Sequence, residues 1–107
     1  MRNPYRGEVT LVINGVPRVM RLTLGALAEL EESMSADSLL NLVDRFETGK
    51  YSSRDVIALL VAGLRGGGWT GGADHLQSAV IEGGAGRAVQ AAAELLVCAF
   101  SVPAKAT

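Results

Sequence analysis

The residues that could do chemistry are few and lie far apart along the chain. His75 is the only histidine and Cys98 the only cysteine among the 107 residues. A nucleophilic pair of the two is formally possible, but Cys98 is expected in the middle of an apolar helix, where a thiol stays protonated and unreactive. One His and one Cys also cannot supply the four ligands of a structural zinc site. The sequence therefore predicts neither an enzyme nor a bound metal.

One further motif could suggest a ligand. Gly66, Gly68 and Gly71 match the dinucleotide-binding pattern G-x-G-x-x-G. That pattern binds a pyrophosphate where it joins a strand to a helix in a βαβ unit. Here it follows a predicted helix, and no further strand is expected after it. Acidic pairs such as Glu29 with Glu32 are typical of a solvated helix face. We expect no cofactor.

The composition excludes several classes of partner. The formal net charge is −1, and 49% of the residues are hydrophobic but only 5% aromatic. Such a chain has no overall field that would attract nucleic acid or an anionic membrane. The longest apolar runs, 56–64 and 91–102, are too short to span a bilayer, and polar Met1–Arg6 predicts no signal peptide. With a single cysteine, these features favour a reducing, cytoplasmic location without nucleic acid or membrane binding.

Residues 7–32 predict a β-hairpin whose second strand leads into a helix. Asn14-Gly15 is typical of a two-residue type I′ turn, in which both residues need a positive φ. Thr23 can then cap a helix from about Leu24. The turn also sets the strand register, which pairs Ile13 with Val16, Leu11 with Arg18, Val9 with Met20 and Glu8 with Arg21.

Apolar periodicity predicts four to five packed helices after the hairpin. Gly49 favours a left-handed C-cap, and Ser52 with Asp55 is a capping-box pattern. The helix that follows Ser52 is so apolar that it should be the central one. The chain is therefore expected to be a single α+β domain, 1–107, with a loose arm 1–6, a hairpin 7–24 and a helical part 24–102. The expected helices are 24–32, 37–48 (capped by Ser35), 54–65, 73–82 and a last one that begins at about Ala85 or Arg87 and ends at about Ser101.

Two surfaces are candidates for binding a partner, although both could equally be buried within the monomer. A two-stranded sheet has two edges, and Pro17 blunts the second strand. The outer edge of the first strand is therefore the expected docking line, by strand addition suited to a small homo-oligomer. The apolar last helix could hold an amphipathic helix, and Trp69 is either a lid on the core or an interface anchor. The predicted partner-binding residues are Thr10, Val12, Val19, Arg21, Trp69, Phe100 and Val102.

Read as a whole, the chain resembles the gene-transfer-agent tail assembly chaperones, a branch of the tailed-phage tail assembly chaperones. The resemblance covers nearly the whole chain, although residues 69–73 contain more glycine than the family pattern. It rests on Asn3, Pro4, Arg6, Gly7 and Glu8 at the start, Gly15 in the turn, Leu27, Leu30 and Glu31 on the first helix, and the segments Leu64–Gly68 and Ala91–Phe100.

The resemblance implies an interaction protein. Such a chaperone binds the tape-measure protein, helps to recruit the tail-tube protein, acts in the cytoplasm of the bacterial host and is absent from the mature particle. An alternative is a structural tail component, tube or connector, for which a single hairpin supplies little sheet. A small DNA-binding regulator is a third possibility, but no predicted helix carries the clustered Lys and Arg that a groove-binding helix needs.

Overall fold

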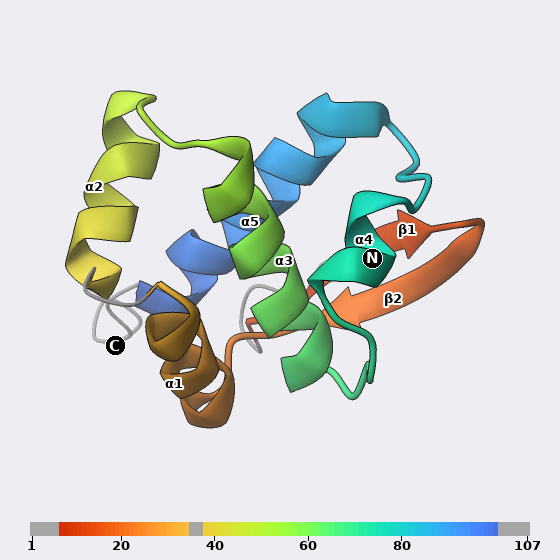
Figure 1. The fold of residues 1–107 in the computed structure, drawn as a ribbon, viewed down its shortest axis with the longest axis horizontal. Helices are drawn as coiled ribbons and strands as arrows, with labels where there is room; N and C mark the ends of the chain where they lie inside the picture. The colour runs from red at the N-terminus through yellow and green to blue at the C-terminus, as the bar shows by residue number, and fades with distance from the viewer. Residues whose placement is uncertain (1–6, 35–37, 101–107) are drawn as a thin grey trace, which may run out of the picture.

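The computed structural model describes residues 7–34 and 38–100. Within them, a two-stranded antiparallel sheet is followed by five helices (Figure 1). The predicted α+β fold is therefore confirmed. The elements are β1 (Val9–Ile13), β2 (Val16–Met20), α1 (Leu24–Ser33), α2 (Leu39–Thr48), α3 (Ser53–Gly66), α4 (Ala73–Gln77) and α5 (Gly84–Phe100).

The hairpin has the predicted turn and register. Asn14 and Gly15 have φ values of 51° and 80°, as a type I′ turn requires. Ile13 pairs with Val16 and Val9 with Met20. On the other face, Glu8 and Arg21 form an ion pair with 2.7 Å between Oε2 and Nη2. The local sequence is therefore sufficient to set this part of the fold.

The helix caps follow side-chain chemistry, with one shift in position. The Thr23 hydroxyl accepts a hydrogen bond from the Ala26 amide, and Gly49 ends α2 in the left-handed conformation, as predicted. Ser52 and Asp55 form the predicted capping box of α3. For α2 the capping residue is Ser38, whose hydroxyl accepts from the Asn41 amide. The cap and first residue that we predicted there, at 35 and 37, lie outside the described residues.

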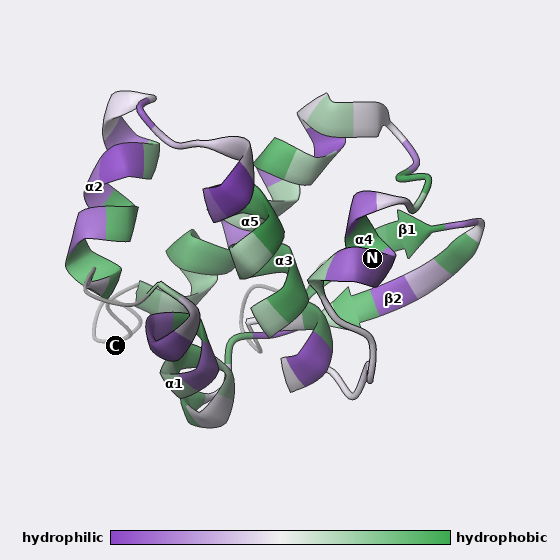
Figure 2. Cartoon of the chain, viewed as in Figure 1, coloured by the Kyte–Doolittle hydropathy of each residue, from purple (hydrophilic) through white to green (hydrophobic). Residues whose placement is uncertain are grey.

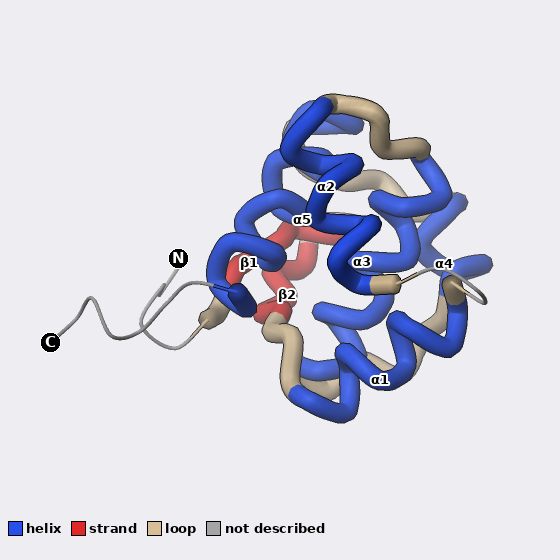
Figure 3. Tube along the Cα trace, turned by 90° about the vertical axis from the view of Figure 1, so that its left-hand side faces the viewer, coloured by secondary structure: helices blue, strands red, loops and turns tan. Residues whose placement is uncertain are grey.

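Helix α3 is the centre of the core, as its apolar sequence predicts. It packs against α1, α4, α5 and β2, while α5 also packs against β1. Figure 2 shows that the middle of α3 consists of hydrophobic residues, with hydrophilic residues toward its two ends. Figure 3, viewed from the end of the molecule opposite the hairpin turn, shows the strands behind the helices. The fully buried large side chains are Val9, Leu11, Met20, Leu30, Leu42, Leu59, Leu60, Leu64 and Leu95.

The C-terminal end of α3 lies directly against the backbone of β2. The Arg21 amide donates to the Gly63 carbonyl at 3.0 Å. A Cβ atom on Gly66 would collide with the Arg21 carbonyl oxygen, and one on Gly67 would collide with that of Val19. Glycine is therefore needed where α3 meets β2, because only a residue without Cβ permits this approach.

The fourth helix is shorter than predicted. It was expected to reach Glu82, but α4 ends at Gln77. The following residues leave the helix because they pair with β1, through a bridge between Ile13 and Ile81. A contact between segments so distant in the sequence cannot be read from helical periodicity.

Candidate functional site

The outer edge of β1 is covered by the chain itself. The Glu82 amide donates to the Val12 carbonyl at 3.0 Å, and the Asn14 amide donates to the Val80 carbonyl at 2.8 Å. Further along, the Arg87 guanidinium donates to the Thr10 carbonyl at 2.6 Å. The expectation of an open docking edge at Thr10 and Val12 is therefore wrong, because residues 80–87 occupy it.

The tip of β2, by contrast, is exposed. We define the hairpin tip as residues Val16–Val19, all of which are solvent-exposed. Val16 and Val19 retain 45% and 43% of their accessible surface, although β1 beside them is largely buried. Arg18 forms no ion pair with residues 7–34 or 38–100. Two predicted partner-binding residues lie on β2 or directly after it. Val19 is exposed, and Arg21 is also exposed but forms an ion pair with Glu8.

Trp69 covers the core near the C-terminal end of α3. Its side chain is half-buried and packs against the core cluster. The ring meets His75 edge-on, with 6.2 Å between centroids. A Cβ atom on Gly71 would collide with the indole, so the glycine loop lies directly against the ring. Trp69 and His75 therefore have structural contacts with each other, although neither is completely enclosed.

An apolar groove lies between α2 and α5. We call it the α2–α5 groove; its volume is about 370 Å³. Phe46 on one wall also stacks on Tyr51 with 4.7 Å between ring centroids. Val97 and Phe100 on the other wall are 66% and 42% exposed. Phe100 was predicted as a partner-binding residue; Val102 lies outside the described residues. The groove is lined by Val43, Phe46, Glu47, Ala93, Leu96, Val97 and Phe100.

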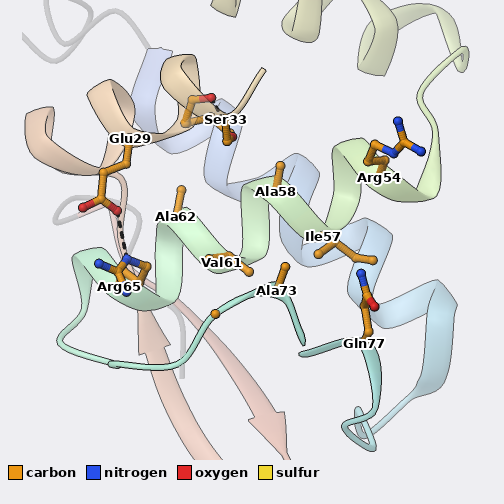
Figure 4. A pocket seen from close by; sticks show the side chains of 12 residues that line it. Glu29, Ser33, Arg54, Ile57, Ala58, Val61, Ala62, Arg65, Ala73 and Gln77 are labelled. Carbon is orange, nitrogen blue, oxygen red and sulfur yellow. Dashed lines mark hydrogen bonds and ion pairs between the residues drawn. The ribbon is translucent and has the colours of Figure 1, made fainter. Parts of the chain in front are cut away.

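A second apolar groove, of about 430 Å³, lies over α3, between α1 and α4. We call it the α3 groove. Figure 4 shows its floor, which Ile57, Ala58, Val61 and Ala62 form, with the Glu29–Arg65 ion pair at one end and Arg54 at the other. The hydrogen bond from Arg65 to Glu29 raises the pKa of the guanidinium. Sequence reasoning missed this groove, although apolar side chains on more than one side of α3 signal that not all of them can be buried.

The described residues contain no cluster of side chains that could bind a metal ion. Within 7–34 and 38–100, no group of three His, Cys, Asp or Glu side chains is placed to hold an ion. His75 lies on α4 and half-buried Cys98 on α5. No described helix is long and apolar enough to cross a membrane. The features that remain for function are the hairpin tip and the two apolar grooves.

A comparison with protein families shows to which family the chain belongs. The family model described as "Phage tail tube protein, GTA-gp10" matches residues 6–102. The chain belongs to this family. Neither a curated protein nor a solved structure matches the chain. The match covers the hairpin and all the described helices, so a tail protein of a phage or gene transfer agent, expected from the sequence, is confirmed.

The family match also corrects two expectations. A tail tube protein is a structural component, so the expected function as a tail assembly chaperone is wrong. The expectation that the protein is absent from the mature particle is wrong for the same reason. The motifs behind these expectations consist of turn glycines and buried leucines. Such residues specify a fold. A fold alone does not distinguish a structural tube protein from an assembly chaperone.

Proposed function

We propose that the protein is a structural subunit of the tail tube of a tailed phage or gene transfer agent. The observation that carries the proposal is the match to the tail tube family over residues 6–102. This is the alternative raised from the sequence, and the match favours it. Its partners are then other copies of the same chain. A tape-measure protein stays a predicted partner, and the absence of enzymatic activity stays a prediction.

The dimensions of the molecule support assembly from many copies. The chain measures 38 × 32 × 25 Å, and its interior is filled by a core in which α3 is surrounded by the other elements. A molecule of this size with a filled interior cannot enclose a channel. A tube made of this chain therefore requires repeated copies, and each copy needs surfaces that bind its neighbours.

The sheet of this chain is smaller than a tube wall built from extended strands would require. Only two strands are described, and the outer edge of β1 is covered by residues 80–87. Contacts between copies must then use side chains on the helices and the hairpin tip. The exposed apolar side chains Val16, Val19, Val97 and Phe100 are suited to this purpose.

Immunogold labelling of finished particles tests the proposal. An antibody against this chain should label the tail along its length, and mass spectrometry should find many copies per particle. Labelling confined to one end would instead indicate a connector. Absence of the chain from purified, tailed particles would contradict a structural role, provided that a known capsid protein from the same preparation is detected as a control.

A further inference from the structure

The hairpin tip is exposed and held in a fixed position, as is expected of an element that inserts into a neighbouring molecule. Val16 and Val19 are exposed, and Arg18, which is also exposed, lies between them in the sequence. The turn that precedes them, Asn14-Gly15, is held by residue 80. The Asn14 amide donates to the Val80 carbonyl, and the Asn14 side-chain oxygen accepts a hydrogen bond from the Val80 amide at 2.9 Å. A tip held in place loses little conformational freedom when it binds, which favours association.

The α2–α5 groove is complementary to this tip. Its walls are apolar, and its one charged lining residue is the carboxylate of Glu47. Asp44 lies one turn earlier on α2 and is also exposed. Neither acid forms an ion pair with residues 7–34 or 38–100. The groove therefore offers apolar contacts for valine together with an acidic rim for arginine.

The charge of the α3 groove argues against insertion of the hairpin tip into that groove. Its charged lining residues are Arg54, Arg65 and Glu29, two positive groups against one negative. Glu29 is already paired with Arg65 at 2.9 Å, which leaves Arg54 as the group facing an incoming ligand. A tip that carries Arg18 would meet like charge there, and like charges at an interface disfavour the pairing.

The positions of tip and groove determine what such a contact builds. The hairpin turn and the α2–α5 groove lie at opposite ends of the longest dimension of the molecule (Figure 1). A contact between two different patches is heterologous. It adds copies head to tail and closes into a ring when the rotation between neighbours permits.

We propose that the hairpin tip of one copy inserts into the α2–α5 groove of the next copy, with Arg18 paired to Glu47, and that this contact joins subunits around the tube. The inference rests on the proposed function and specifies the surface through which it operates. The occupant of the groove is thus a second copy of this chain.

Charge reversal with complementary mixing tests the contact. Arg18→Glu and Glu47→Arg should each weaken self-association at least tenfold in analytical ultracentrifugation, because each places like charges at the contact. An equimolar mixture of the two variants should associate again. In that mixture the acidic tip of one variant meets the basic groove of the other, and the native tip meets the native groove. The double variant should also associate.

Matched controls separate this contact from general changes in charge or apolarity. Arg54→Glu reverses an exposed arginine in the other groove and should leave association unchanged. Val97→Asp should weaken association, whereas Leu40→Asp, on an equally exposed part of α2, should not. Circular dichroism should show every variant folded. If a reversal variant fails to fold, a Val16→Cys/Val97→Cys variant in a Cys98→Ser background should give a disulfide-linked ladder.

The outcomes distinguish this inference from the proposed function. Association that survives both reversals, or that mixing does not restore, overturns the tip-to-groove contact and leaves the tube proposal in place. A wild-type protein that stays monomeric at the highest concentration also overturns the contact. Labelling of finished particles then decides the proposed function separately.

Discussion

Arg45 on α2 forms a two-point ion pair with Asp55, the residue that also completes the N-terminal cap of α3. The Nε–Oδ2 and Nη2–Oδ1 distances are both 2.9 Å. The same carboxylate accepts a hydrogen bond from the Ser52 amide at 3.0 Å. One side chain thereby fixes both the start of the central helix and the position of α2, which forms a wall of the α2–α5 groove.

Stability should consequently depend on the ionisation of Asp55. Burial alone would raise its pKa, but hydrogen bonds from Arg45 and Ser52 outweigh burial and hold the pKa below the usual 3.8. The unfolded chain then binds the proton at a higher pH than the folded chain. The stabilisation is therefore complete above the unfolded pKa and is lost as the pH falls through the folded one.

Asp55→Asn tests this dependence. At pH 7 it should lower the free energy of unfolding by about 1–3 kcal/mol, since it weakens charged hydrogen bonds. Urea titration at successive pH values should show the difference from wild type shrinking below about pH 4. Asp44→Asn changes an exposed acid on α2 that forms no ion pair within residues 7–34 and 38–100; it is the control and should change stability little. A gap between Asp55→Asn and wild type that is constant down to pH 2 would contradict the assigned pKa.

Leu60→Ala should be strongly destabilising. The side chain is 2% exposed at the middle of α3, so truncation removes burial and leaves a cavity. We expect a loss of about 2–5 kcal/mol in urea titration. Leu40→Ala, at 75% exposure, should cost less than about 0.5 kcal/mol. Equal losses for the two would mean that α3 is not the central helix.

Two glycine substitutions should change stability in opposite directions. Gly66→Ala places a Cβ against the Arg21 carbonyl oxygen, and one of the two backbones must move. We expect a cost of about 1–3 kcal/mol. Gly86→Ala, in α5 with open space around it, should instead stabilise by about 0.5–1 kcal/mol through helix propensity. Thermal unfolding of both variants measures the signs; a stabilised Gly66→Ala would show that α3 and β2 are further apart.

Asn14 should link the hairpin turn to residues 80–82. Asn14→Gly keeps the positive φ but removes the acceptor for the Val80 amide, so hydrogen exchange at that amide should accelerate. Asn14→Ala additionally disfavours the left-handed backbone and should cost about 1–2 kcal/mol more. Unchanged exchange at Val80 in both variants would mean that the side-chain hydrogen bond does not hold this segment.

Thermal-shift measurements should show no stabilisation by Zn²⁺, Mg²⁺ or nucleotides. The glycine motif at 66–71 follows α3 and not a strand, which is the wrong setting for a pyrophosphate. A saturable rise in Tm with any of these ligands would overturn the prediction, because a ligand that binds only the folded state raises Tm.

The parts of the fold that short-range chemistry controls could be predicted from the sequence. Asn14-Gly15 determines the turn and its register, and Thr23 and Ser52 cap the helices that follow them. These features depend on residues within a few positions of one another. The hydrophobic pattern of α3 likewise identified the central helix and Leu60 within it.

Features that depend on distant segments could not be predicted. The periodicity of residues 73–82 favours one helix, but pairing of Ile81 with Ile13 ends it early and covers β1. The α2–α5 groove arises where Phe46 and Val97 come together from separate helices. Apolar side chains at such positions have the same pattern whether tertiary packing buries them or leaves them exposed. The sequence therefore singled out Phe100 and Val19, which are exposed, but it did not indicate the groove that Val97 and Glu47 line. That these residues bind a partner stays a prediction.

The coverage of the β1 edge bears on how this chain avoids aggregation. A free sheet edge can recruit further strands through its backbone without regard to sequence. Here Glu82 and Arg87 hydrogen-bond to the outward carbonyls of β1, at Val12 and Thr10. On β2, Pro17 lacks the amide that would begin a ladder. Amyloid-like growth from the hairpin is thus opposed on both sides. If the chain forms a tail tube, as we propose, many copies must coexist before assembly, and covered strand edges would leave the choice of neighbour to side-chain contacts.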